Sequence, residues 1–226
     1  MSCPMSVRTL LEGWCEDVPE LVITGLALDS RRVGRGQAFV AVAGAQAHGM
    51  AFARQAESRG AAIVLHDGLA EVPMLGIPAL AVPGLGGRLS SLGARFYHNP
   101  SERLVVAGVT GTNGKTSTAC WIGQMLSKAG RRCAVLGTIG SGFAEETLTA
   151  SALTTPDAIS LQREVLRLLR AGADVRVLDE LPGACDRGFS DAEHGVGRGA
   201  GQRQLPCGCP GCRRYRGIDG RQGPTR

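Results

Sequence analysis

The residues best suited to chemistry lie in one short segment, residues 109–116, which reads VTGTNGKT. A continuous apolar run, Leu104–Val109, precedes it, as expected for a parallel strand covered on both faces. A helix predicted over Thr116–Ala129 follows, so the N–H groups of its first turn face the segment. Glycines let such a turn bring its backbone close to phosphate oxygens. The order of strand, loop and helix therefore predicts a nucleotide-phosphate-binding loop over Gly111–Ser117.

The side chains of this loop have distinct predicted roles. Lys115 would reach the outer phosphates as a point charge, which makes it the candidate catalytic residue. The Thr116 hydroxyl would bind Mg²⁺, which bridges phosphate groups. The general pattern places glycine where this chain has Val109, so the loop is a variant, and the alternative is a glycine-rich turn that binds nothing. The predicted nucleotide-binding residues are Gly111, Thr112, Asn113, Gly114, Lys115, Thr116 and Ser117.

Two sets of predicted elements surround this loop, and both alternate strands with helices. The first set predicts a small α/β domain over residues 1–100, with His98–Ser101 as the linker. Its strands are predicted at Leu21–Leu28, Ala38–Ala43, Ala61–Leu65 and Ala79–Val82, and its helices at Gly49–Arg59 and Leu85–Tyr97.

The second set begins at Leu104 and contains the loop. A strand at Cys133–Leu136 and a helix at Asp157–Ala171 follow the loop helix, which is the opening of a doubly wound, mostly parallel sheet. Residues 101–174 are therefore expected to form an incomplete nucleotide-binding domain. The remainder, residues 175–226, has no clear helical or strand period and is expected to be irregular or disordered.

Composition excludes several classes of function. The chain has 226 residues and a net charge of +5, but the basic excess lies near its end, and no stripe of basic and aromatic residues predicts nucleic-acid binding. No apolar run approaches the roughly 20 residues that a membrane helix needs. The first residues lack the apolar core of a signal peptide. We therefore expect a cytoplasmic protein, a monomer, that binds neither nucleic acid nor membrane.

The loop and its flanks resemble a known family. The segment GVTGTNGKTST is similar to the ATP loop of the Mur ligases of peptidoglycan synthesis and of their folylpolyglutamate synthase relatives. The stretch LALDSRRVGRGQAFVAVAGAQAHGMAFARQAESRGAAIVL resembles the first domain of the Mur ligases that add the third residue or the terminal dipeptide to the muramyl peptide. The segments RFYHNPSERL, LGTIG and LTTPDA favour the members that add the third residue. The resemblance covers residues 5–173.

The resemblance implies ligands as well as a fold. The cofactors would be ATP and Mg²⁺, and the partners a UDP-N-acetylmuramoyl peptide and an amino acid, diaminopimelate or lysine. The residues that would bind the UDP-sugar peptide are Leu28, Ser30, Ala45, Gln46, Ala47, Thr154 and Thr155. Taken without the resemblance, Asp29-Ser30-Arg31 reads as a turn with a local side-chain cap, and the paired threonines as a helix start.

The implied reaction is ATP-dependent amide-bond formation. The substrate carboxylate attacks the γ-phosphate to give an acyl phosphate, and the amine of the amino acid then displaces phosphate. The later motifs of the family do not appear in residues 174–226, so we expect residues 1–226 alone not to complete the reaction. The alternatives are a nucleotide- or UDP-sugar-binding module without catalysis, and a different phosphate-loop enzyme such as a kinase.

Histidines and cysteines are the residues of this chain that could form a metal site. His48, His66 and His98 show no metal-ligand spacing and are predicted to be surface or loop residues. The cluster Cys207-x-Cys209-x-x-Cys212, with Cys185 or His194 as a fourth ligand, does not have the spacing of a standard zinc knuckle or ribbon. Three interpretations of residues 175–226 stay open: an out-of-frame translation of a longer ligase gene, a natural ending, or a metal module.

The out-of-frame interpretation makes a prediction about the coding DNA. A tail rich in Arg, Gly, Pro and Cys without Lys is what a shifted reading of GC-rich codons tends to produce. We expect a one-base shift near codon 174 to open a frame that encodes a Glu-Val-Ser-Ser-like strand. Sequencing the gene tests this, and the idea fails if neither alternative frame continues the family pattern.

Overall fold

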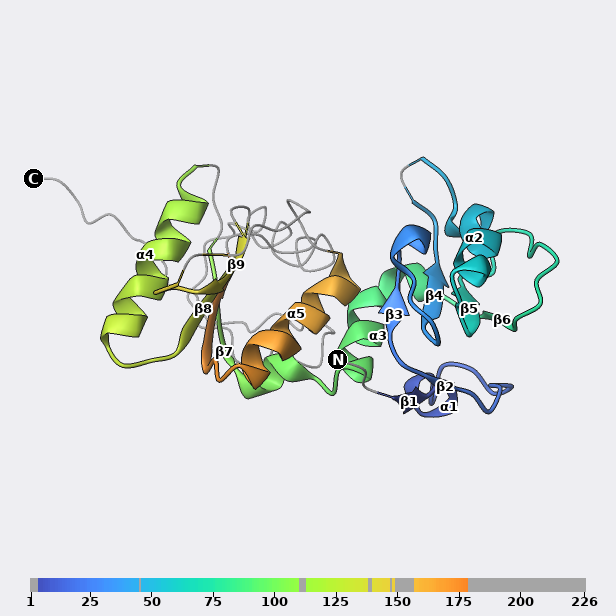
Figure 1. The fold of residues 1–226 in the computed structure, drawn as a ribbon, viewed down its shortest axis with the longest axis horizontal. Coiled ribbons are helices and arrows are strands. Elements are labelled where there is room, and N and C mark those ends of the chain that lie inside the picture. Colours follow the sequence, from blue (N-terminus) through green and yellow to red (C-terminus); the bar gives the residue numbers. More distant parts are fainter. Residues whose placement is uncertain are drawn as a thin grey trace, which may run out of the picture. The chain divides into compact units, whose positions relative to one another are not determined.

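The structure is a computed structural model that describes residues 4–44, 46–109, 113–137, 140–146, 148 and 157–178. The chain forms two compact units, which are described separately. The first unit comprises residues up to Pro100 and the first part of helix α5 (Ala158–Arg170), as far as Leu166. The second begins at Ser101 and takes up the chain again from Arg167 (Figure 1).

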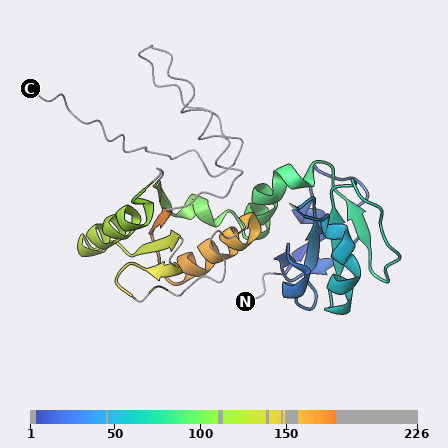
Figure 2. The same ribbon diagram turned by 90° about the horizontal axis from the view of Figure 1, so that it is seen from above.

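A parallel four-stranded sheet forms the centre of the first unit (Figure 2). Its strands, in spatial order, are β3 (Leu26–Ala27), β4 (Ala38–Ala41), β5 (Ile63–His66) and β6 (Ala79–Ala81). Successive side chains of a strand point to opposite faces, and in β3, β4 and β5 the side chains on both faces are buried. Ala38, Val40, Ile63 and Leu65 enter one hydrophobic core, while Ala27, Phe39, Ala41 and Val64 enter another. The buried faces explain why these strands read as unbroken apolar runs.

Short helices cover each face of this sheet. The short 3-10 helix η2 (Gly49–Phe52) continues into α2 (Ala53–Ser58), whose Ala53 and Ala56 are buried in the second core. The first core contains residues of α1 (Val7–Leu10), of the 3-10 helix η3 (Leu85–Arg88) and of α3 (Leu89–Phe96).

Trp14 ties the start of the chain to α3. Its ring lies 5.1 Å from the guanidinium carbon of Arg88 and 4.6 Å from that of Arg95. Arg95 also donates a hydrogen bond of 2.8 Å to the Glu12 carbonyl. These contacts combine cation–π attraction with satisfaction of a backbone acceptor, so they hold the segment after α1 against α3.

The predicted linker begins at the end of α3. His98 and Asn99 have φ angles of 59° and 48°, in the left-handed region that non-glycine residues rarely adopt. The Asn99 N–H donates to the Ala94 carbonyl at 2.7 Å and the His98 N–H to the Arg95 carbonyl at 3.1 Å. This pattern is a Schellman cap, which satisfies the last carbonyls of the helix and turns the chain. The 3-10 helix η4 (Pro100–Arg103) follows.

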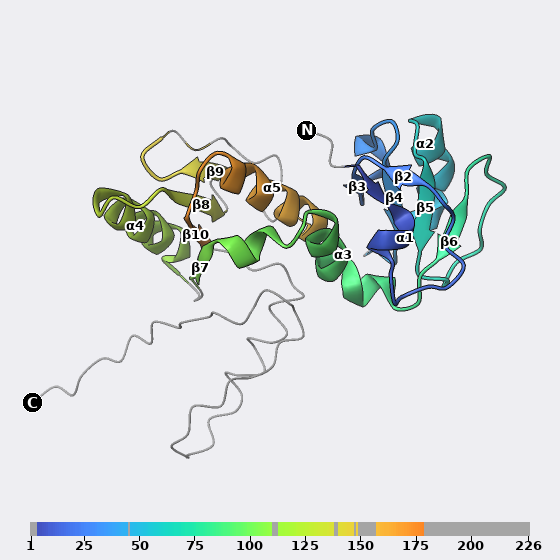
Figure 3. The ribbon, with the colours of Figure 1, turned by 90° about the horizontal axis from the view of Figure 1, so that it is seen from below.

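In the described part of the second unit, four strands form a sheet in the order β7, β10, β8, β9. Their bounds are β7 (Val105–Gly108), β8 (Cys133–Gly137), β9 (Gly140–Phe143) and β10 (Val175–Leu178). Strands β7, β10 and β8 are parallel, and β9 pairs antiparallel with β8. Helix α4 (Lys115–Lys128) packs on one face of this sheet through Ala119, and the end of α5 leads into β10 (Figures 1 and 3).

The expected fold class, an α/β fold with parallel sheets, is confirmed. The single strand predicted over Leu21–Leu28 is wrong. Val22–Ile23 (β2) pairs with Met5–Ser6 (β1), whereas β3 belongs to the four-stranded sheet. The break comes at Thr24 and Gly25, where the Thr24 N–H bonds the Gly36 carbonyl and the chain leaves one sheet for the other.

The prediction that regular structure ends before Val175 is also wrong. Residues Val175–Leu178 form β10, which pairs with β7 on one side and with β8 on the other. The charged Arg176 in the middle of a four-residue run hid the strand from the sequence pattern, although its side chain is only 4% exposed. Strand β9, which reads GSGF, was missed because two glycines remove the strand signal.

Close packing of α4 on the sheet predicts the effect of a small substitution. A Cβ at Gly123 would lie 2.7 Å from Val135 Cγ2 and 2.9 Å from Ala144 Cβ. We expect Gly123→Ala to lower the free energy of unfolding by about 1 kcal/mol, because overpacking outweighs the gain in helix propensity. Urea denaturation measures this.

The matched control is Gly87→Ala, where an added Cβ meets no atom within 4 Å. It should leave the free energy of unfolding within about 0.5 kcal/mol of its original value. Equal stability of the two variants would contradict the packing argument.

Candidate functional site

The predicted phosphate loop connects β7 to α4 in the second unit. Gly114 precedes the helix with φ 79° and ψ 0°, a left-handed conformation that suits glycine. Lys115 is the first residue of α4, and the first backbone bond of the helix runs from the Thr118 N–H to the Gly114 carbonyl at 2.9 Å. The N–H groups of Thr116 and Ser117 therefore have no acceptor inside the helix, as at any helix start.

The residue that precedes the loop is also held in place, by a backbone hydrogen bond. The Val109 N–H donates to the Leu178 carbonyl at 2.7 Å, which links the last residue before the loop to the end of β10. Asn113 and Ser117 are exposed, and Lys115 and Thr116 are partly exposed. Gly111 and Thr112 lie outside the described residues. The described part fits a phosphate and a cation, because it joins a left-handed glycine, a helix N-terminus, a lysine and a hydroxyl.

The first group of predicted substrate residues follows β3 in the first unit. Asp29 caps the 3-10 helix η1 (Ser30–Arg32): its Oδ1 accepts from the Arg31 N–H at 2.9 Å. The Arg31 side chain also binds this carboxylate through Nε at 3.0 Å and Nη2 at 2.9 Å, and these bonds lower the pKa of Asp29. The local cap expected from Asp-Ser-Arg is therefore present, and Leu28 before it is half-buried.

Ser30 is buried, and its partner was not identified from the sequence. Its side chain is directed to α2, where the Ser30 hydroxyl donates to Gln55 Oε1 at 2.6 Å. Residue spacing gives no signal for this pair, since twenty-five positions separate the two residues. Gln55 thus fixes the orientation of a hydroxyl that the family resemblance assigns to the substrate.

The second group follows β4. Gln46 and Ala47 are exposed, and Ala45 lies outside the described residues. The turn is closed by a hydrogen bond of 3.1 Å from the Gly44 N–H to the Ala47 carbonyl. Immediately after it, His48 Nε2 lies 2.9 Å from Asp67 Oδ1, a contact that residue spacing did not predict.

His66 corrects the prediction that the histidines are surface or loop residues. It ends β5 and is only 5% exposed, and its Nδ1 accepts from the Gly68 N–H at 3.2 Å. Burial lowers the pKa of the His66 imidazole; Asp67 opposes this shift, and His48 adds to it. His98 is exposed, as predicted.

The predicted site residues fall in both units. Leu28, Ser30, Gln46 and Ala47 belong to the first, and the phosphate loop belongs to the second. Thr154 and Thr155, and the whole cysteine cluster with Cys185 and His194, lie outside the described residues. Within the described ranges, no group of three or more His, Cys, Asp and Glu side chains is arranged to hold a metal ion. No helix in the same ranges is long and apolar enough to cross a membrane.

Comparison with known proteins identifies these two regions. Residues 109–180 match the Mur ligase middle domain, and residues 22–97 match the model described as Mur ligase family, catalytic domain. The chain belongs to the Mur ligase family. The first match extends to residue 180, so it includes β10, beyond the limit expected from the sequence.

Individual relatives agree with this assignment. The UDP-N-acetylmuramoyl-L-alanyl-D-glutamate–2,6-diaminopimelate ligase of Alkalilimnicola ehrlichii is 41% identical over 181 residues, which are 75% of this chain and 36% of that protein. The ligase of the same name from Pseudomonas aeruginosa is 39% identical over 187 residues, 82% of this chain and 38% of that protein. The chain thus spans little more than a third of the length of these relatives.

Two solved structures are similar to this chain. A structure of UDP-N-acetylmuramoyl-L-alanyl-D-glutamate–2,6-diaminopimelate ligase matches with a TM-score of 0.63 and 27% identity, over 78% of this chain and 36% of that one. A structure of the D-alanyl-D-alanyl-adding ligase from Acinetobacter baumannii matches with a TM-score of 0.53 and 21% identity, over 78% and 36% of the two chains, which bears on the fold alone.

The buried His66 predicts a pH dependence of stability. The pKa of His66 is lowered in the folded protein, so the unfolded chain takes up a proton first as the pH falls through 6.5. We expect the free energy of unfolding to decrease below pH 6.5 and to level off once the folded protein also takes up the proton. Urea denaturation at a series of pH values measures this slope.

His66→Asn is the informative variant, because asparagine can still accept from the Gly68 N–H but does not titrate. It should flatten the slope just below pH 6.5. A slope that is the same in both proteins would show that another group is responsible.

Proposed function

We propose that this chain is the UDP-sugar- and ATP-binding part of a ligase that adds diaminopimelate, or lysine, to UDP-N-acetylmuramoyl-alanyl-glutamate. The observation that carries the proposal is the arrangement at the start of α4. Gly114 in a left-handed conformation places Lys115 and Thr116 on the first turn, directly after the strand β7 and its loop. The relatives named diaminopimelate ligases support the substrate class.

In this proposal, the second unit binds ATP·Mg²⁺. Backbone N–H groups of the loop and of the first turn bind phosphate oxygens, and Lys115 neutralises the outer phosphates. The Thr116 hydroxyl is the proposed protein ligand of Mg²⁺, which supplies charge stabilisation for phosphoryl transfer. Gly111, Thr112, Asn113 and Ser117 complete the proposed set.

The first unit binds the UDP-sugar peptide in this proposal. Leu28, Ser30, Gln46 and Ala47 lie after the carboxyl ends of β3 and β4, and ligands of open parallel sheets bind outside those ends. The buried Ser30–Gln55 hydrogen bond supports a preorganised site, because it orients the hydroxyl before any ligand arrives. Ala45, Thr154 and Thr155 are proposed members on the family resemblance alone.

The alternative is a binding module without catalysis. Both proposals require ATP·Mg²⁺ and UDP-sugar binding, and only the ligase requires turnover. Release of phosphate that depends on the UDP-sugar peptide and diaminopimelate together would decide for the ligase. Binding of both ligands without turnover agrees with either proposal, because residues 1–226 alone are not expected to complete the reaction.

Nucleotide binding is tested at Lys115. We expect Lys115→Ala to weaken ATP·Mg²⁺ binding at least about tenfold, since a charge-assisted contact to phosphate is lost. Isothermal titration of ATP in the presence of Mg²⁺ measures the dissociation constant.

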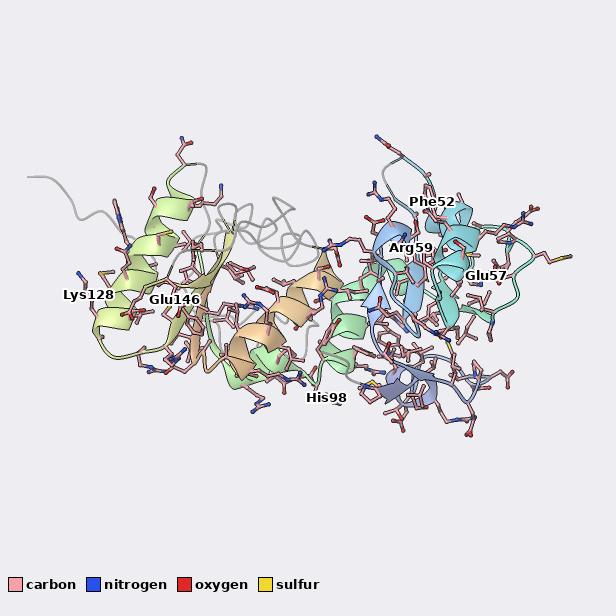
Figure 4. The ribbon with its side chains drawn as sticks, in the orientation of Figure 1. Phe52, Glu57, Arg59, His98, Lys128 and Glu146 are labelled. Atoms are coloured by element: carbon pink, nitrogen blue, oxygen red, sulfur yellow. The ribbon has the colours of Figure 1, made fainter. Side chains whose placement is uncertain are left out.

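Lys128 provides a matched control, because it is the only other lysine in the chain and lies at the opposite end of α4 (Figure 4). Lys128→Ala removes the same charge from the same helix and should leave the affinity unchanged. Equal affinities of the original protein and folded Lys115→Ala protein would refute the assignment of the loop.

A further inference from the structure

The turn that carries Gln46 and Ala47 is held at both of its ends. Before the turn, β4 ends at Ala41, which lies beside His66 of β5 in the parallel register. After the turn, His48 forms an antiparallel bridge with Ala43, and the Gly49 N–H donates to the Val42 carbonyl at 2.9 Å. The returning chain is packed against β4 itself.

Gly49 makes that close return possible. A Cβ at residue 49 would lie 2.8 Å from Ala41 Cα and 3.0 Å from the Val42 nitrogen, both backbone atoms. A side chain there would have to displace the strand. Because Asp67 directly follows β5, the same edge of the sheet brings its carboxylate beside both arms of the turn.

The Asp67 carboxylate accepts hydrogen bonds from three segments. Its Oδ2 accepts from the Ala43 N–H at 3.3 Å, before the turn, and its Oδ1 accepts from His48 Nε2 at 2.9 Å, after the turn. Oδ1 also accepts from the Leu69 N–H at 3.1 Å, which closes a local turn. The side chain of Asp67 is only 7% exposed.

The hydrogen bond at the other ring nitrogen of His48 indicates its tautomer. Its Nδ1 accepts from the Met50 N–H at 3.1 Å and so caps η2, which leaves the proton on Nε2. The Nε2–H therefore donates to Asp67. One imidazole thus joins the start of η2 to the carboxylate at the end of β5.

We propose that Asp67 and His48 are positioning residues that hold the turn of Gln46 and Ala47 in its ligand-binding conformation for the uridine nucleotide. The proposal rests on the proposed function, since it takes the turn as part of the UDP-sugar site. Neither residue needs to touch the ligand. Both act by restricting a turn that is also closed by the Gly44–Ala47 hydrogen bond and by the return of Gly49 to the Val42 carbonyl.

Two substitutions remove different hydrogen bonds of the Asp67 carboxylate. In Asp67→Asn, the amide oxygen can still accept from His48 and Leu69, but the amide nitrogen opposes the Ala43 N–H. In His48→Asn, the shorter side chain can still cap Met50 but does not reach Asp67. Asp17→Asn is the matched control, because it makes the same chemical change on an exposed carboxylate of the same unit.

The experiment uses the full chain and two readouts. Hydrogen exchange of the peptide covering residues 43–48, without ligand, should quicken about tenfold in both variants, since a hydrogen bond to a charged group is lost. Titration with UDP should show affinity lowered about tenfold in both variants, with ATP·Mg²⁺ affinity unchanged. Asp17→Asn should change neither quantity.

The outcomes are distinguishable. If UDP binds the original protein, but exchange and UDP affinity stay unchanged in both variants, the positioning role is wrong. Faster exchange with unchanged UDP affinity also overturns it, because the turn would then not belong to the site. If UDP does not bind the original protein, the proposed function of the first unit fails. If one of the two variants is destabilised as a whole, with a lower melting temperature, the other variant carries the test, because it breaks a different contact.

Discussion

The pairing of β10 between β7 and β8 is the interaction on which the second unit depends. β10 hydrogen-bonds to β7 along one edge and to β8 along the other, so it joins the strand before the phosphate loop to the rest of the sheet. The same strand presents Val175 and Val177 to the face that α4 covers. Without β10, the strand before the phosphate loop would lose the neighbour with which it pairs in the described part of the sheet.

A backbone hydrogen bond connects β10 to the candidate phosphate site. The Leu178 carbonyl accepts from the Val109 N–H, so the end of β10 positions the residue from which the loop departs. On the far side of the loop, α4 is positioned by close contact of Gly123 with the sheet. The described residues on both sides of the loop are therefore positioned by packing within the second unit, Val109 by its bond to β10 and the start of α4 by the contact of this helix with the sheet.

In the first unit, side chains from distant segments hold the loops that carry the candidate substrate residues. Its loops follow parallel strands whose carboxyl ends share one edge, and side chains from neighbouring connections hold them. Gln55 on α2 orients Ser30, and Asp67 after β5 contacts both arms of the turn after β4. In each case the supporting residue comes from a segment remote in sequence, and the supported residue is one that the family resemblance assigns to the substrate.

The amino-acid sequence by itself determined the α/β class and most helices and strands of the described chain, and it predicts the phosphate loop. These features are local: apolar runs of strand length, helical spacing, and glycines with a lysine and a threonine between a strand and a helix. Only the tertiary structure decided that Leu21–Leu28 divides between two sheets and that Val175–Leu178 is a central strand. Pairing partners and packed faces make those choices, and a short segment such as VRVL carries no periodic signal of its own. For the same reason, the contacts of Asp67 with Ala43 and His48 arise only when the ends of β4 and β5 meet at one edge of the sheet.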